Sequence, residues 1–234
     1  MPPNSATDRA YEYLRGQILS CTLAPGSRIV EGDIATVLNM SNTPVKRALG
    51  MLIYEGFVEV QPRHGYRVTE ITLADVQEIY QLRQVVEPAA AELAAANATP
   101  EQLQEMRNLV EDDPDSSYTD RAERVLRFHE VLAEASGNAR LASVLSGLMD
   151  EMQRLLYLGL DISESVALHS GEHRELLDAL LKGNHHLARE IAENQVEVGR
   201  MRMFEAILAS LTSAGGTADR VVLNPPPGTS NGES

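Results

Sequence analysis

The chain has 234 residues, of which 43% are hydrophobic and 4% aromatic, so it can form two modest domains with largely aliphatic cores. No apolar run approaches the length of a membrane span, no secretory signal pattern is present, and the single Cys21 excludes an internal disulfide, so we expect a cytoplasmic protein. The net charge of −14 is unevenly distributed: residues 1–69 carry a net charge of +1 and the remainder a net charge of −15. Because DNA repels an acidic surface, only the N-terminal part is suited to approach it.

The N-terminal part predicts three short helices and a β-hairpin. Thr7 is the expected cap of the first helix and Ser41 the expected cap of the third. In the second helix, we expect Ile34, Val37 and Leu38 to face inward. By apolar spacing, the expected helices are 7–20, 31–38 and about 41–55, and the expected strands are 57–61 and 66–68.

Beyond residue 69 the sequence predicts long amphipathic helices and no strand. Pro88 lies inside the first of them, where it is expected to kink the helix. The expected helices are 73–97, 100–111, 120–136, 139–160, 163–182 and 185–211. We predict a mainly α protein with a winged helix-turn-helix domain at 1–69, an all-α helical bundle for effector binding and dimerisation at 70–212, and a disordered tail at 213–234.

A helix, a short turn and a second helix form the helix-turn-helix plan, in which the second helix enters the major groove of DNA. The start of that helix offers short polar groups and two cations, and the hairpin tip offers a basic wing. The predicted DNA-binding residues are Ser41, Asn42, Thr43, Lys46, Arg47, Arg63, His64 and Gly65. The alternative is that Ser41 is only a cap and that the cations form a solvated face.

Three segments in the N-terminal part strongly resemble the winged head of the GntR family of bacterial regulators. They are LAPGSRI at 23–29, LNMSNTPVKRAL at 38–49 and EGFV at 55–58. The helical remainder resembles the FCD effector domain of the FadR-type branch of that family. The segments that carry this second resemblance are YQLRQVVE at 80–87, FHEVL at 128–132, SGN at 136–138 and EH at 172–173.

The head of this chain, residues 1–69, departs from the family pattern at two positions. Asn42 and Lys46 stand where the family usually has Arg. Because Lys lacks the planar fork with which Arg binds guanine, we expect DNA binding to persist with a different operator sequence.

The resemblance also implies a divalent metal, held by an Asp, a His four residues later and two further His. His129 and His173 match two of these positions, but Val125 and Gln195 occupy the other two. His169, one turn before His173, is a further candidate ligand. We expect no cofactor, and a metal-responsive regulator is the alternative.

Arg83 lies among apolar residues of the expected helix 73–97, and its fork suits a ligand carboxylate. The alternative is an ion pair with Glu87, four residues later. The resemblance favours the ligand role, because this Arg often faces the cavity of the domain. The other expected effector-binding residues are His129, His173, Gln195 and Arg154, and for each His the alternative is a satisfied core histidine.

These observations predict a homodimeric transcription regulator that binds a near-palindromic operator and responds to a small carboxylate effector. Repression relieved by the effector is what the resemblance implies. An enzyme is not expected, because the chain has no serine nucleophile motif, no glycine-rich phosphate loop and no complete metal set. A protein-interaction module is the third class, and the basic residues of the head argue for DNA instead.

Overall fold

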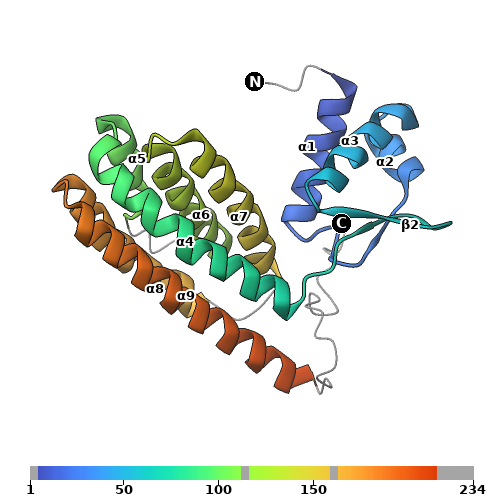
Figure 1. The fold of residues 1–234 in the computed structure, drawn as a ribbon. Coiled ribbons are helices and arrows are strands. Elements are labelled where there is room, and N and C mark those ends of the chain that lie inside the picture. Colours follow the sequence, from blue (N-terminus) through green and yellow to red (C-terminus); the bar gives the residue numbers. More distant parts are fainter. Residues whose placement is uncertain (1–4, 112–115, 159–162, 215–234) are drawn as a thin grey trace. The chain divides into compact units, whose positions relative to one another are not determined.

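The computed structural model describes residues 5–111, 116–158 and 163–214, so the expected tail at 213–234 lies almost wholly outside the described residues. The chain divides into a first unit up to Leu73 and a second unit that begins at Ala74 (Figure 1). Both units are mainly helical, and the first also contains a small antiparallel sheet, which confirms the expected fold class. In the described ranges, no helix combines the length and apolar character needed to cross a membrane.

The first unit contains three helices and three strands. In chain order they are α1 (Ala6–Leu19), β1 (Arg28–Ile29), α2 (Glu31–Val37), α3 (Asn42–Tyr54), β2 (Val58–Gln61) and β3 (Gly65–Val68). The strands form an antiparallel sheet in the order β1-β3-β2. The two residues of β1 were not predicted as a strand, because so short a segment shows no alternation.

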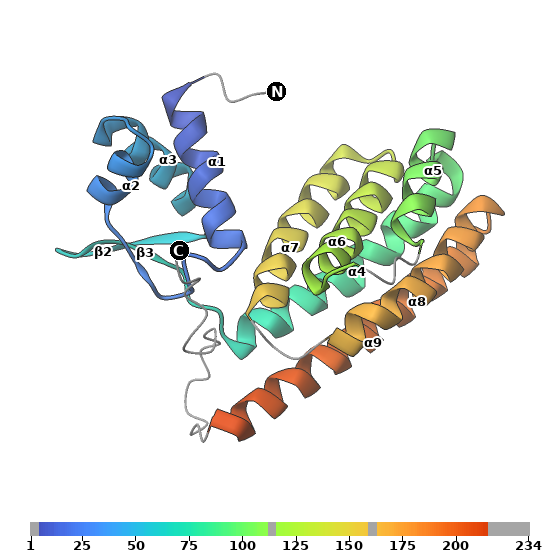
Figure 2. The same cartoon turned by 180° about the vertical axis from the view of Figure 1, so that it is seen from behind.

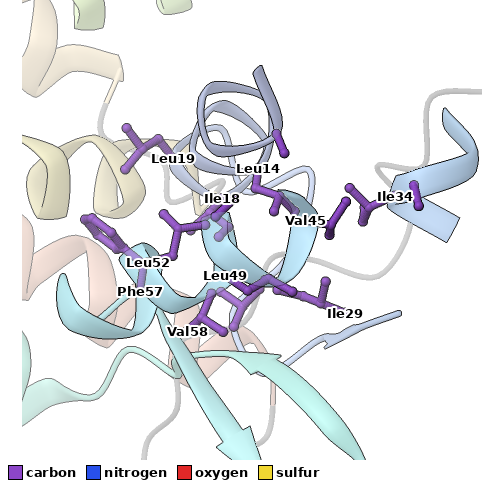
Figure 3. Close-up of a cluster of buried hydrophobic side chains, with 14 residues drawn as sticks. Leu14, Ile18, Leu19, Ile29, Ile34, Val45, Leu49, Leu52, Phe57 and Val58 are labelled. Carbon is purple, nitrogen blue, oxygen red and sulfur yellow. The ribbon is translucent and has the colours of Figure 1, made fainter. Parts of the chain in front are cut away.

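The core of this unit fills the space between α1, α3 and the sheet (Figure 3). Leu14 and Ile18 of α1 meet Val45 and Leu49 of α3, and all four side chains are fully buried. Each such side chain contributes about 1.5–3 kcal/mol through removal of apolar surface from water. This packing fixes the angle at which α3 is presented.

Two expectations about the helices of the head are wrong. The N-cap of α1 is Ser5 rather than Thr7: the Ser5 hydroxyl accepts the Asp8 N–H and the Asp8 carboxylate accepts the Ser5 N–H. In α2, Val37 is 64% exposed, and the buried pair is Ile34 and Ala35. With only seven residues, α2 presents a narrow stripe to the core.

The turn between α2 and α3 depends on a left-handed residue. Asn39 has φ of 49°, a conformation that asparagine adopts more readily than most residues. Its N–H donates to the Thr36 carbonyl, and the N–H of Met40 donates to the Ala35 carbonyl. These bonds close α2 and direct the chain into α3.

The second unit is a bundle of six helices in the described part of the chain. They are α4 (Leu73–Asn97), α5 (Pro100–Leu109), α6 (Tyr118–Ala135), α7 (Ala139–Tyr157), α8 (Ser163–Leu181) and α9 (His185–Ala214). Helix α4 crosses the front of the bundle in Figure 1 and its back in Figure 2, while α6 and α8 pack directly against each other. All six expected helices are present, and α4 has the predicted bounds.

Candidate functional site

The start of α3 carries the predicted base-reading residues on an exposed surface. Ser41 is the N-cap residue of α3, as expected, and its backbone is extended there; its side chain makes no capping hydrogen bond. Ser41, Asn42 and Thr43 are all exposed. The first backbone N–H groups of a helix lack intrahelical acceptors and attract anions, so this end suits a DNA phosphate or base edge.

Lys46 and Arg47 are exposed one turn further along α3. The Lys46 ammonium lies 3.3 Å from a carboxylate oxygen of Glu31, in the first turn of α2. This neighbour offsets part of the Lys46 charge, and sequence reasoning did not identify it. Lys46 is therefore expected to attract a phosphate less strongly than the neighbouring Arg47.

The β2–β3 hairpin forms the wing. The N–H of His64 donates to the Gln61 carbonyl, and Arg63 and Gly65 both have positive φ, at 68° and 86°. The three predicted wing residues, Arg63, His64 and Gly65, are all exposed. At the base of the wing, Arg67 pairs with Glu59 of the opposite strand at 2.7 Å, which ties the two strands together.

In the second unit, the predicted effector-binding residues are all buried, and three of them, Arg83, His129 and His173, lie close together. Arg83 and His129 are joined through Glu87, which is only 1% exposed. Nε of Arg83 donates to one oxygen of Glu87 at 2.5 Å, and Nδ1 of His129 lies 3.1 Å from the other oxygen. The ion pair with Glu87, an alternative in the sequence, is therefore present.

Only one nitrogen of Arg83 meets the Glu87 carboxylate in this ion pair. Nη1 donates to the thioether sulfur of Met152 at 3.3 Å, and the guanidinium carbon lies 4.9 Å from the ring centre of Tyr80. A thioether is a weak hydrogen-bond acceptor, so Nη1 of this buried cation has a weaker partner than a carboxylate would be.

The two buried histidines are held by aromatic packing. The His173 ring stacks on Phe128 with centroids 4.2 Å apart, and the His129 ring meets His173 edge-on at 4.9 Å. The elements that supply them, α6 and α8, pack against each other. The sequence did not single out Phe128, although it directly precedes His129.

The charges of Arg83 and Glu87 in this buried cluster, which also contains His129 and His173, strongly affect each other's pKa. Burial alone raises the pKa of Glu87, but the Arg83 charge and the hydrogen bond with His129 outweigh it and bring the pKa to about 2. The pKa of Arg83 is raised, because attraction to Glu87 exceeds the cost of burial. Glu87 therefore stays ionised, and it is a site residue that the sequence indicated only as a partner of Arg83.

The remaining two expected residues have other partners. The Gln195 side-chain amide donates to the Glu172 carbonyl at 2.6 Å, next to His173 in the chain. Arg154 is 2% exposed and pairs with Glu151 at 3.4 Å, one turn earlier on α7. Burial raises the pKa of Glu151, which weakens this carboxylate as a counter-ion.

The cluster does not fit the metal site that the resemblance implies. Among residues with described side chains, no three His, Cys, Asp or Glu are arranged to hold a metal ion. Val125 is apolar, Gln195 bonds to the backbone, and His129 is turned toward Glu87. The side chain of His169 lies outside the described residues.

Comparisons with known proteins identify both units. The model of bacterial regulatory proteins of the gntR family matches residues 6–68, and the FCD domain model matches residues 78–197. An HTH-type transcriptional regulator in an unstable DNA locus of Streptomyces ambofaciens is 32% identical over 190 residues, covering 80% of both chains. The HTH-type transcriptional repressor RspR of Escherichia coli is 26% identical over 188 residues, covering 77% of this chain and 81% of RspR. A crystal structure of a GntR-type regulator from Rhodococcus sp. RHA1 superposes with a TM-score of 0.76 at 25% identity, covering 86% of this chain and 98% of that one.

Proposed function

This chain belongs to the GntR family of DNA-binding transcriptional regulators and carries an FCD effector-binding domain, and we propose that it is a homodimeric, cytoplasmic repressor released from DNA by a carboxylate effector. In this proposal residues 1–69 are the DNA-binding domain and residues 70–212 the effector and dimerisation domain. Two heads read the two half-sites of a near-palindromic operator. Support for repression comes from the similarity to RspR.

The observation that carries the carboxylate proposal is the partial pairing of Arg83. Its buried guanidinium gives Nε to Glu87, while Nη1 faces the thioether of Met152. A ligand carboxylate that replaces the sulfur gains a charge-assisted hydrogen bond in a site shielded from water. The His129 and His173 rings pack against each other in the same buried region, and in this proposal they contact the rest of the ligand.

Effector binding changes operator affinity only if the ligand binds one arrangement of the heads more tightly than another. The experiment measures operator affinity by fluorescence anisotropy in the presence of monocarboxylates and dicarboxylates of increasing length. The matching amides are the controls for charge. A carboxylate that weakens operator binding, with an inert amide, supports the proposal.

A double variant, Arg83→Met with Glu87→Leu, removes the ion pair without leaving either charge buried alone. We expect it to bind the operator like the wild type and to lose the carboxylate response. An unchanged response would contradict the role of Arg83. Native mass spectrometry of the wild type then tests the alternative: one metal ion per chain would support a metal-responsive regulator.

A further inference from the structure

The face of α3 that points away from the core carries a glycine near its centre. On the opposite side of the helix, Leu49 and Leu52 point into the core of the head (Figure 3). The outward face is exposed along its whole length, and its members recur at intervals of three and four residues, which places them on one side of the helix. They are Thr43, Arg47, Gly50 and Tyr54.

No contact within the described chain requires a glycine at position 50. Its backbone is helical rather than left-handed, and a Cβ added there would meet no atom within 4 Å. An exposed glycine inside a helix makes that helix less stable than an alanine would. A residue that lowers stability without relieving any crowding in the chain is explained by close approach of another molecule, and the outward face of α3 is the face that DNA would meet.

The length of α3 places Gly50 where the helix would leave the groove. A recognition helix reads base edges from its N-terminal end, in a major groove about 12 Å wide and about 8.5 Å deep. With a rise of about 1.5 Å per residue, Gly50 lies about 12 Å from Asn42 along the helix, and Tyr54 about 18 Å from it. When Asn42 is at the base edges, the sugar-phosphate strand that borders the groove therefore passes α3 near Gly50, with Tyr54 just beyond the strand.

The charges of α3 permit this contact along the whole helix. Its 13 residues include no Asp or Glu, in a chain that contains 34 of them. The first acidic residue after the helix is Glu55, and its carboxylate accepts hydrogen bonds from the Tyr11 hydroxyl at 2.9 and 3.0 Å, which hold it toward α1. The second half of α3 therefore presents no carboxylate of its own to repel a phosphate strand.

We propose that one sugar-phosphate strand of the operator crosses α3 at Gly50, and that the Tyr54 hydroxyl donates a hydrogen bond to a phosphate of this strand. The inference rests on DNA binding by the head and adds what sets the depth of α3 in the groove. Gly50 is a positioning residue, because a side chain there would hold Asn42 and Thr43 away from the base edges. Tyr54 is 94% exposed, and its neutral hydroxyl is a donor of the kind that binds phosphate.

The test of Gly50 uses the full chain and a DNA duplex that the wild type selects from a random pool. Gly50→Ala should bind this duplex at least about tenfold more weakly, as for the loss of one base contact, and Gly50→Leu should lose more. In the free protein, amide exchange in α3 should be no faster in Gly50→Ala than in the wild type, because alanine favours a helix. Gly16→Ala is the matched control: Gly16 is exposed in α1, and an added Cβ there also meets no atom within 4 Å. Its affinity should stay within about twofold of the wild type.

A double-variant cycle separates positioning from a general loss of binding. Asn42→Ala should weaken binding about tenfold in the wild-type background and much less in Gly50→Leu, where the helix no longer places residue 42 at the bases. Equal losses in the two backgrounds, or wild-type affinity in Gly50→Ala, would overturn the role of Gly50 while DNA binding by the head stands. If the wild type selects no duplex, this inference and the proposed function are both wrong.

Tyr54→Phe tests the phosphate contact, because it removes only the hydroxyl. We expect it to weaken binding of the selected duplex about three- to tenfold, the usual effect of one lost hydrogen bond. Tyr13→Phe makes the same change on α1, where the ring packs against the core of the head, and its affinity should stay within about twofold of the wild type. Wild-type affinity in Tyr54→Phe, or an equal loss in Tyr13→Phe, would overturn the phosphate contact of Tyr54.

Discussion

Arg83 and Glu87 form a buried ion pair one helical turn apart on α4, with Nε and Oε1 separated by 2.5 Å. Neither side chain is more than 8% exposed. Two charges removed from water at this depth depend on each other, because either one alone pays the full cost of desolvation. The pair therefore contributes both to the stability of the helical bundle and to the charge of the buried site formed by Arg83, Glu87, His129 and His173.

Removal of one member of this pair should destabilise the second unit strongly. Glu87→Gln keeps the shape of the side chain but leaves the Arg83 charge buried without a counter-ion. We expect a loss of about 3–5 kcal/mol in the free energy of unfolding, measured by urea denaturation followed by circular dichroism. In the same assay, Arg83→Met with Glu87→Leu should lose far less, and an equal loss would contradict the ion-pair explanation.

The pair also predicts a pH dependence of stability. The pKa of Glu87 is about 2 in the folded chain against an ordinary value of 4.5, so ionised Glu87 stabilises the fold fully above about pH 4.5. That contribution, on the order of 3 kcal/mol, is lost as the pH falls from 4.5 toward 2. Unfolding free energies between pH 6 and pH 3 should fall more steeply for the wild type than for the double variant. Parallel curves would show that other carboxylates cause the acid sensitivity.

The contact between Lys46 and Glu31 predicts unequal roles for the two cations of α3. Glu31, 3.3 Å from the Lys46 ammonium, offsets part of the charge of Lys46, so Arg47→Ala should weaken operator binding more than Lys46→Ala. For Arg47→Ala we expect about a tenfold loss, with the slope of log affinity against log salt reduced by about one.

Glu31→Gln tests the same contact from the other side. Because it releases Lys46 and removes a negative charge near DNA, it should raise operator affinity and steepen the salt dependence. Anisotropy titrations at several salt concentrations measure both quantities. Weaker binding by Glu31→Gln would mean that Glu31 instead positions Lys46 for DNA.

Asn42, at the first position of α3, should act on specificity rather than on general affinity. An exposed asparagine here suits a bidentate contact with adenine, worth about 1–3 kcal/mol against the wrong base. Asn42→Ala should lower operator affinity about tenfold or more and leave binding to unrelated DNA unchanged. Equal losses on both DNAs would assign Asn42 to the phosphate backbone.

Most of the fold was predictable from local patterns. The bounds of α4 were predicted to the residue, because a long periodic segment ends at an Asn-Ala-Thr-Pro break. The errors involve short elements, where few residues define a pattern: the cap at Ser5, the exposed Val37 and the two-residue strand β1. The family assignment is confirmed by the two domain models.

The sequence predicted which residues belong to the candidate site better than it predicted how they contact one another. Sequence reasoning singled out Arg83, His129, His173, Gln195 and Arg154, and all five are buried. It did not reveal that Glu87 bridges Arg83 and His129, or that His173 stacks on Phe128. It also gave no sign that Glu31 lies against Lys46.

The helices, the two-part organisation and the family follow from the amino-acid sequence, because they depend on periodicity, turn residues and motifs within short stretches of chain. Which buried charges meet, and which carboxylate lies against Lys46, depends on the tertiary structure. Those features depend on side chains from helices far apart in the sequence, whose distances no local pattern encodes.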